Sequence, residues 1–366
     1  MRVCAPGRVN LIGDHTDYTG GLVFPMAIDR WTEISYEIAD DVTTLTSADE
    51  TGTVTFPKDA QFDAAFSPRW GRYVLAVATQ LAHARSISGH ITTTIPVGAG
   101  LSSSAALEMA VALALGSNHS SQELALLGQR AEQLATGVPT GIMDQLCIAS
   151  AQAQHGTLID CHTLNVHHIP IPDDIEIVVQ FIAHRTLEGS EYADRVAQCA
   201  TAESLIGPLR MATLNDVATI KDSTIQQRAH HVVSENARVA QFIDALTQND
   251  YVAAGRIMNA SHHSLATDFA TSTQQMNDAV AASCATPGVY GARMTGGGFG
   301  GCIVALCTPG SELPGWKVQP VGAVHHVNYR CEITYATVYV PAPMRYFSNV
   351  SGPQLAVPTP RCAISR

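Results

Sequence analysis

The sequence lacks two features that would place the protein in other classes. Its longest uninterrupted apolar stretch, around residues 109–115, is well short of the ~18 residues that a membrane-spanning helix needs. It has 21 Lys and Arg against 32 Asp and Glu, a formal net charge of −11, and no basic cluster that could bind the phosphates of a nucleic acid. We therefore expect no interaction with membranes or nucleic acids.

Cysteine pairs are also missing. The nine cysteines are scattered along the chain without a C-x-x-C pair, which argues against both a disulfide framework and a zinc site. The first residues show no apolar targeting segment either, of the kind that a secreted protein carries. We expect reduced thiols and a cytoplasmic protein.

The length and the residue pattern predict two domains that mix helices and strands. The chain has 366 residues, 46% of them apolar, which suits two domains of ~150–200 residues each. Apolar residues at a spacing of three to four predict helices over 70–83, 102–116, 122–134, 140–150, 192–209, 225–246, 251–264 and 273–285. Runs of β-branched and apolar residues predict strands over 31–38, 42–46, 87–95, 157–167, 175–183, 289–293, 302–306 and 333–340.

A glycine-rich loop with three serines follows the strand predicted at 87–95. Residues 96–106 have the sequence PVGAGLSSSAA, and the helix after the loop would direct its free N–H groups and positive dipole end at one spot, which favours a phosphate. The loop has no lysine after its last glycine to neutralise that phosphate. Backbone N–H groups, serine hydroxyls and a metal ion would have to hold it. The alternative is a tight turn with an N-capping serine, which explains one serine but not three.

A second glycine-rich loop lies about 200 residues further along the chain. Residues 294–301 have the sequence MTGGGFGG, and so many glycines allow positive φ angles and a close approach of the backbone to another group. A tight connection between two strands is the alternative. The functional interpretation depends on whether this loop meets the first one in space.

The N-terminal segment 7–21, GRVNLIGDHTDYTGG, brings an arginine, two carboxylates and a histidine together. We expect one polar loop, whose carboxylates would suit a polyhydroxylated ligand because an ionised aspartate accepts several hydrogen bonds from hydroxyls. An Asx-rich turn is the alternative.

Five segments together resemble the motifs of the galactokinases, a family of the GHMP small-molecule kinases. In chain order they are APGRVNLIGDHTDYTGG, PVGAGLSSSAALE, GIMDQ, GSEY and GARMTGGGFGG. The resemblance extends from Ala5 to about Leu306. It implies an α+β fold with two lobes, a ribosomal S5 domain 2-like N-terminal lobe over 1–170 and a ferredoxin-like C-terminal lobe over 171–366.

The resemblance also implies site residues. Asp144 matches the catalytic carboxylate, which accepts the proton of the attacking hydroxyl, and Arg8 the arginine that keeps it ionised. The matches to the sugar-binding segments are Asp14, His15, Thr16, Asp17 and Tyr192, with Asp144 beside them. The residues that match the ATP loop of the family are Gly98, Ala99, Gly100, Leu101, Ser102, Ser103 and Ser104. Ser104 and Glu132 match the positions that hold Mg²⁺, although Glu132 by itself is typical of an exposed helix residue.

Two positions depart from the family pattern. Galactokinases usually have glutamate where Asp14 stands, which makes the carboxylate one methylene shorter and bears on sugar specificity. After Leu306 the usual closing helix is not evident, and the proline-rich segment beyond about residue 341 matches no motif.

The sequence thus predicts a monomeric enzyme that uses ATP and Mg²⁺ to phosphorylate galactose at its anomeric hydroxyl. Phosphoryl transfer suits such a site because it requires in-line positioning and charge neutralisation more than covalent chemistry. The alternatives are a related kinase for another sugar and a non-catalytic sensor of galactose and ATP.

Overall fold

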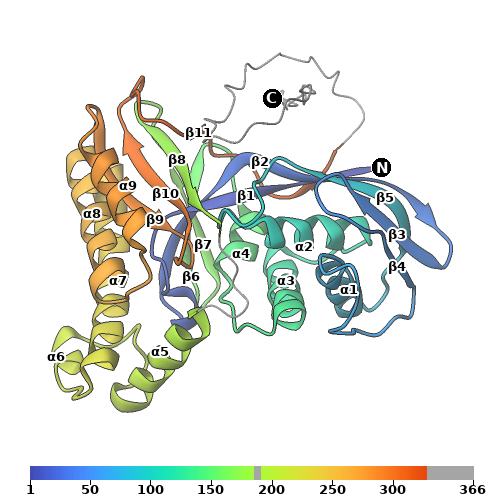
Figure 1. Ribbon diagram of the computed structural model, residues 1–366, viewed down its shortest axis with the longest axis horizontal. Coiled ribbons are helices and arrows are strands. Elements are labelled where there is room, and N and C mark those ends of the chain that lie inside the picture. Colours follow the sequence, from blue (N-terminus) through green and yellow to red (C-terminus); the bar gives the residue numbers. More distant parts are fainter. Residues whose placement is uncertain (185–190, 328–366) are drawn as a thin grey trace, which may run out of the picture. The chain divides into compact units, whose positions relative to one another are not determined.

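The computed structural model describes residues 1–184 and 191–327, shown in Figure 1. Residues Met1–His326 form one compact unit. The strand predicted at 333–340 and the proline-rich segment lie outside the described residues. In the described part of the chain no helix is long and apolar enough to span a membrane.

The first sheet contains eight strands within the described residues. They are β1 (Arg2–Ile12), β2 (Leu22–Ala39), β3 (Val42–Ser47), β4 (Val54–Pro57), β5 (Ser86–Thr93), β6 (His155–Asp160), β7 (Asn165–Pro170) and β12 (His325–His326). The strand order is β12-β1-β2-β5-β3-β4, and the β6–β7 hairpin joins through β6 to β2. All pairs are antiparallel except β3 with β5. β1 therefore lies inside the sheet, between β12 and β2.

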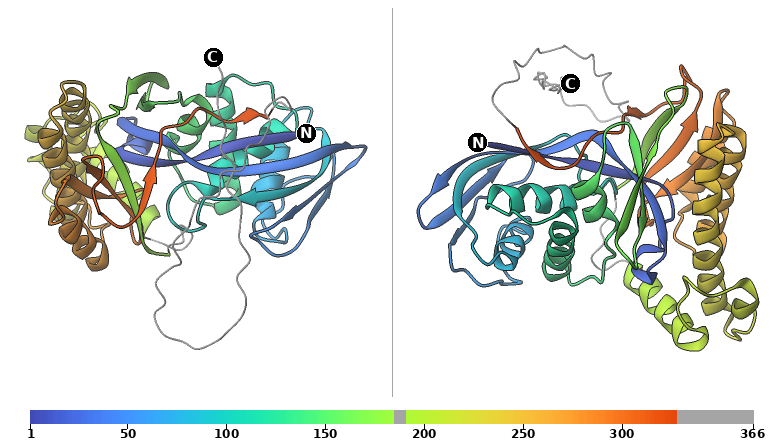
Figure 2. Two further views of the ribbon diagram at one scale, coloured as in Figure 1. Left: turned by 90° about the horizontal axis from the view of Figure 1, so that it is seen from above. Right: turned by 180° about the vertical axis from the view of Figure 1, so that it is seen from behind.

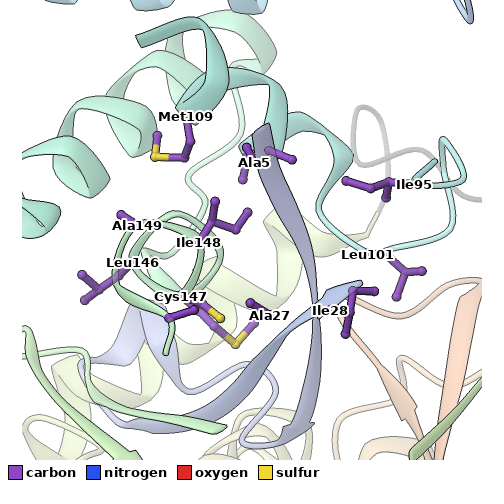
Figure 3. Packing of buried hydrophobic residues seen from close by; sticks show 14 of the residues in the cluster. Ala5, Ala27, Ile28, Ile95, Leu101, Met109, Leu146, Cys147, Ile148 and Ala149 are labelled. Atoms are coloured by element: carbon purple, nitrogen blue, oxygen red, sulfur yellow. The ribbon is translucent and has the colours of Figure 1, made fainter. Parts of the chain in front are cut away.

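Four helices pack on one face of this sheet (Figure 1). They are α1 (Gly71–Gln80), α2 (Ser103–Ala114), α3 (Ser121–Thr136) and α4 (Met143–Ser150). A capping box between Ser120 and Glu123 begins α3, and Gly137, at φ 71°, ends it, as helix-end chemistry favours. Figure 3 shows Ala5 of β1 and Ala27 of β2 packed near Met109 of α2 and Cys147 of α4.

The second sheet has the order β11-β8-β10-β9. Its strands are β8 (Glu176–Ala183), β9 (Val289–Thr295), β10 (Gly301–Cys307) and β11 (Trp316–Val318), and the helices of this half are α5 (Tyr192–Ile206), α6 (Leu214–Val217), α7 (Ser223–Thr247), α8 (Tyr251–Thr267) and α9 (Gln274–Cys284). Figure 2 shows α8 and α9 beside this sheet. Along β10, Val304 and Leu306 join the core shared with the first sheet, whereas Ile303 and Ala305 face a second core.

Most predicted elements match, and two segments differ. The segment 7–21 is not one polar loop, because its first half continues β1 to Ile12 and only Asp17–Thr19 forms a 3-10 turn. The strand predicted at 157–167 is the β6–β7 hairpin, which turns where Leu164 adopts φ 58°. The strand predicted at 175–183 is β8, which is buried at Ile177, Val178 and Val179, whereas Phe181 is 37% exposed.

Helix α8 and strand β9 approach each other through two glycines. A Cβ atom on Gly255 would lie 2.0 Å from the carbonyl oxygen of Tyr290, and one on Gly291 would lie 2.2 Å from the carbonyl oxygen of Gly255. Real Cβ atoms do not come so close to backbone atoms, so the backbones must separate if either glycine gains a side chain. This contact fixes where β9 presents Arg293 and the second glycine loop.

We predict that Gly255→Ala destabilises the protein by about 2 kcal/mol or more, since overpacking against backbone forces α8 away from β9. The measurement is urea unfolding at equilibrium. Gly322→Ala is the matched control, because a Cβ atom there meets nothing within 4 Å. Equal stability of the two variants would contradict the proposed close packing.

Candidate active site

An open cavity of about 460 Å³, a volume that includes solvent space at its mouth, collects residues from both halves of the described chain. Most lining residues are polar or glycine. They are Arg8, Asp14, His15, Asp17, Glu132, Thr140, Gly141, Met143, Asp144, Tyr192, Gly296 and Gly297. Seven of them are residues for which the sequence predicted a role.

A bidentate ion pair joins strand β1 to helix α4. Arg8 donates from Nε to Asp144 Oδ1 and from Nη2 to Asp144 Oδ2, both at 2.6 Å. Its third nitrogen, Nη1, donates to the carbonyl of Gly100 at 2.6 Å. Burial alone would lower the pKa of Arg8, but the Asp144 carboxylate outweighs it and the pKa lies above its usual range. Arg8 is 2% exposed, whereas the Asp144 side chain is 23% exposed, so the carboxylate remains accessible from the cavity.

The first glycine loop lies directly on β1. The backbone N–H of Arg8 donates to the carbonyl of Leu101 at 3.1 Å, an approach that requires Gly7 because a Cβ atom there would lie 2.8 Å from that carbonyl oxygen. Gly98 and Gly100 adopt φ angles of 73° and 77°. Ala99 and Leu101 are buried in the core, so any ATP contact at these two positions would come from their backbone.

Ser102 differs from the expectation that the serines cap the following helix. It precedes α2 in the left-handed conformation at φ 60°, and its hydroxyl donates to Asp144 Oδ2. The first turn of α2, which begins at Ser103, is thus left to bind another acceptor. A phosphate is the acceptor that such a loop and helix start favour.

Ser104 and Glu132 meet beside the ion pair. The Ser104 hydroxyl donates to Glu132 Oε1 at 2.9 Å, although α2 and α3 are separate helices. Glu132 is only 4% exposed, so its interpretation as an exposed helix residue is wrong. Burial, together with the nearby Asp144, raises the pKa of Glu132. A divalent cation would reduce the repulsion between the carboxylates of Glu132 and Asp144. One carboxylate with a hydroxyl and phosphate oxygens is a typical magnesium environment.

Gln145 holds Glu132 from the other side. Its side-chain Nε2 donates to Glu132 Oε2 at 2.8 Å and to Glu108 Oε2 at 3.1 Å. Glu108 is fully buried, and burial with the nearby Glu132 raises its pKa well above the usual range. Within the described residues no group of three or more His, Cys, Asp and Glu is arranged to hold a metal ion, so a metal here would need ligands from its substrate.

Aromatic rings form one wall of the cavity. The His15 ring packs against Phe269 at 4.6 Å and against Tyr192 at 5.5 Å between ring centroids. His15 adopts φ 65°, and its Nδ1 contacts the Tyr18 hydroxyl at 3.1 Å. Tyr192 begins α5 as the sequence predicted, while Gly189 and Ser190 of the same motif lie outside the described residues.

Thr16 and Asp17 have different surroundings although they are neighbours. The Thr16 hydroxyl donates to the carbonyls of Gly13 and Leu22 at 2.8 and 2.7 Å, so it shapes the loop rather than the cavity. Asp17 lines the cavity, and burial, with the nearby Asp144, raises its pKa to about 7. A Cβ atom on Gly141 would lie 1.8 Å from Asp17 Oδ2, which explains the glycine three residues before Asp144.

The second glycine loop meets Asp14. The N–H of Gly296 donates to Asp14 Oδ1 at 2.9 Å, and Arg293 lies 2.5 Å from Asp14 Oδ2. Gly296 and Gly297 line the same cavity as Arg8 and Asp144. Arg293, Thr140 and Met143 were not among the site residues predicted from the sequence. Their only signal is their place within or next to the GARMTGGGFGG and GIMDQ segments.

Comparison with known proteins identifies the family. Residues 1–37 match the galactokinase galactose-binding signature, 72–152 the N-terminal domain of GHMP kinases and 242–313 their C-terminal domain. The chain is 40% identical to the galactokinase of Chloroflexus aggregans over 82% of each chain. It is 39% identical to that of Canis lupus familiaris, covering 84% of this chain and 83% of the other. The chain belongs to the galactokinase family.

Solved structures agree with this assignment to the galactokinase family. The crystal structure of Lactococcus lactis galactokinase complexed with galactose matches with a TM-score of 0.81 and 28% identity, covering 89% of this chain and 95% of that one. The mevalonate kinase of Methanococcus jannaschii matches with a TM-score of 0.65 and 18% identity over 88% and 98%. The two-lobed GHMP kinase fold predicted from the sequence is therefore confirmed.

We predict that Asp17→Asn stabilises the protein at pH 8 and not at pH 3.5. The pKa of Asp17 is raised in the folded state, so the native protein binds this proton more tightly than the unfolded chain, and stability falls as the pH rises from about 4 to about 7. Asparagine has no charge to bury. Unfolding midpoints of both proteins across this range test the prediction, and a difference that is constant with pH would contradict it.

Proposed function

We propose that this chain transfers the γ-phosphoryl group of ATP to the anomeric hydroxyl of galactose, forming galactose 1-phosphate and ADP. The observation that carries the proposal is the Arg8–Asp144 ion pair, which presents a partly exposed carboxylate to a polar cavity beside the serine loop. Membership of the galactokinase family and the likeness to a galactokinase complexed with galactose support the substrate.

Asp144 acts on the sugar hydroxyl in this proposal. It accepts the hydroxyl's hydrogen bond and receives its proton, while the hydroxyl oxygen forms a bond to the γ-phosphorus and the bond from that phosphorus to ADP breaks. Arg8 holds the carboxylate of Asp144 in place through two hydrogen bonds. The hydroxyl of Ser102, also bound to Asp144, helps to fix the carboxylate's orientation.

The first glycine loop binds the phosphates of ATP through residues 98–104. The support is local: two glycines with positive φ, Ser102 in the left-handed conformation and a helix that begins at Ser103. These features aim backbone N–H groups at one place, which suits phosphate oxygens. The cavity beside them holds the sugar against Asp14, His15, Asp17 and Tyr192.

Ser104 and Glu132 would hold the Mg²⁺ that accompanies ATP. Their oxygens lie 2.9 Å apart, and the metal would supply positive charge against the phosphate oxygens of the nucleotide. The family's use of ATP supports a divalent cation. The choice of Mg²⁺, the monomeric state and the cytoplasmic location stay predictions.

We predict that purified protein releases ADP with galactose and that Asp144→Asn lowers kcat about 100-fold or more, because general-base assistance typically contributes 10²–10⁴-fold. ADP release is measured across a panel of sugars, and ATP binding by calorimetry. The Asp144→Asn variant should bind ATP as the wild type does, since the substitution removes the group that accepts the proton of the sugar hydroxyl. Asp29→Asn, on a partly exposed carboxylate that pairs with Arg30 and accepts a hydrogen bond from the N–H of Gln319, is the control and should keep full turnover.

Two results would count against the proposed reaction. Turnover with another sugar and none with galactose would move the assignment to a related kinase, a possibility that Asp14 raises. Binding of ATP and galactose without phosphoryl transfer would favour a sensor.

We predict that Glu132→Gln raises the Mg²⁺ concentration for half-maximal activity about tenfold, because the amide removes an ionised ligand. Binding of Mn²⁺ to the protein with a non-hydrolysable ATP analogue, measured by electron paramagnetic resonance, should weaken in parallel. Glu123→Gln on the same helix is the matched control, since glutamine can still complete the capping box with Ser120. Equal metal dependence of the two variants would exclude Glu132 as a ligand.

A further inference from the structure

Arg293 of β9 is the largest fully buried side chain in the described part of the molecule. Its Nη2 lies 2.5 Å from Asp14 Oδ2 and 3.7 Å from Glu235 Oε1. Its Nε donates to the Ser261 hydroxyl at 3.2 Å, and its Nη1 to the carbonyl of Asn10 at 3.3 Å. A guanidinium between two buried carboxylates has a fixed orientation, because turning it would leave charges unpaired.

Glu235 holds Arg293 from the side away from the cavity. Its Oε1 accepts hydrogen bonds from the Ser261 hydroxyl at 2.6 Å and from the backbone N–H of Gly13 at 3.0 Å. Arg238 donates to Oε2 at 2.7 Å. Burial would raise the pKa of Glu235, but Arg238 and Arg293 outweigh it and lower the pKa to about 2. Glu235 is thus a permanent countercharge for Arg293.

Asp14 is held at three points by different elements. Arg293 binds Oδ2, the N–H of Gly296 donates to Oδ1 at 2.9 Å, and the Asp14 carbonyl accepts a hydrogen bond from His231 Nε2 at 3.1 Å. The side chain is 1% exposed and still lines the cavity. Because aspartate has a single methylene, the carboxylate cannot keep these bonds and also extend toward a ligand.

We propose that Arg293 is a positioning residue for sugar recognition, which fixes Asp14 so that its remaining acceptor sites meet hydroxyls of the sugar. A carboxylate has about four acceptor sites. Arg293 and the N–H of Gly296 each contact one oxygen of Asp14, and Asp14 lines the cavity. Its remaining acceptor sites would suit a ligand that donates hydrogen bonds, as a polyol does. This inference rests on the proposed function, since it concerns the sugar bound in the same cavity.

Arg293→Lys is the test, because lysine keeps the charge but loses the guanidinium's fixed fork of donors. We expect KM for galactose to rise about tenfold or more, as charge-assisted hydrogen bonds to a carboxylate typically contribute that factor. KM for ATP should stay within about twofold, since Arg293 acts on the sugar side. The dissociation constant of galactose, measured by calorimetry without ATP, should rise with its KM.

A double-mutant cycle separates positioning from a general loss of stability. If Arg293 acts through Asp14, then Arg293→Met adds less than about twofold to the galactose dissociation constant of Asp14→Asn. The double variant Asp14→Asn/Arg293→Met removes a negative and a positive charge together. It therefore leaves no unpaired charge at Asp14, and it can be measured even if Arg293→Met alone fails to fold. If the increases in the galactose dissociation constant caused by the two single substitutions multiply in the double variant, the two residues act independently and the inference is overturned.

Arg238→Lys is the matched control, because Arg238 pairs with the same Glu235 and, among the described residues, is not part of the cavity lining. It should lower the unfolding midpoint without changing the galactose constants. An equal rise in the galactose constant of Arg238→Lys would assign the effect to the network's stability and reject positioning. Wild-type protein that binds galactose without releasing ADP would count against the proposed function alone.

Discussion

The burial of Arg8 is the constraint on which the site depends. Arg8 of strand β1 is only 2% exposed, so its guanidinium must find an anion within the protein. Asp144 supplies it from the start of α4, 136 residues away in the sequence. Arg8 also fixes the position of the first glycine loop. Its side chain donates to the carbonyl of Gly100 and its backbone N–H to the carbonyl of Leu101. The need to pair the buried charge of Arg8 therefore fixes the positions of β1, α4 and the first glycine loop relative to one another.

Arg293 meets the same requirement in the second sheet. Each arginine has a carboxylate of the cavity on one side and further partners behind it, which are backbone carbonyls for Arg8 and Glu235 with Ser261 for Arg293. The cavity is left with more carboxylates than arginines. Hydroxyl donors and a cation relieve that imbalance, and a sugar with a metal-bound nucleotide supplies both.

The sequence was sufficient where short-range pattern decides structure, and it failed where partners are distant. The helices followed from periodicity, and the motif segments named seven of the residues that line the cavity. The segment 7–21 was misjudged as one polar loop because the pairing partners of its first half, in β2, are not evident from its own residues. Glu132 was misjudged for the same reason, since Ser104 and Gln145, which satisfy it in the interior, come from two other helices. Arg293 carries no local signal of its buried position.

The two glycine loops show that composition alone does not define a phosphate site. The first precedes helix α2, whose first N–H groups have no partner within the helix, and the carboxylate of Asp144 beside it is already bound by Arg8. The second spans β9 and β10, and the N–H of Gly296 is used by Asp14. A donor bound to a carboxylate cannot also hold a phosphate, and the anion beside it would repel one. The absence of a lysine fits the proposed site, because a metal ion bound with ATP would supply positive charge at the first loop, whereas in the second loop the N–H of Gly296 already binds Asp14.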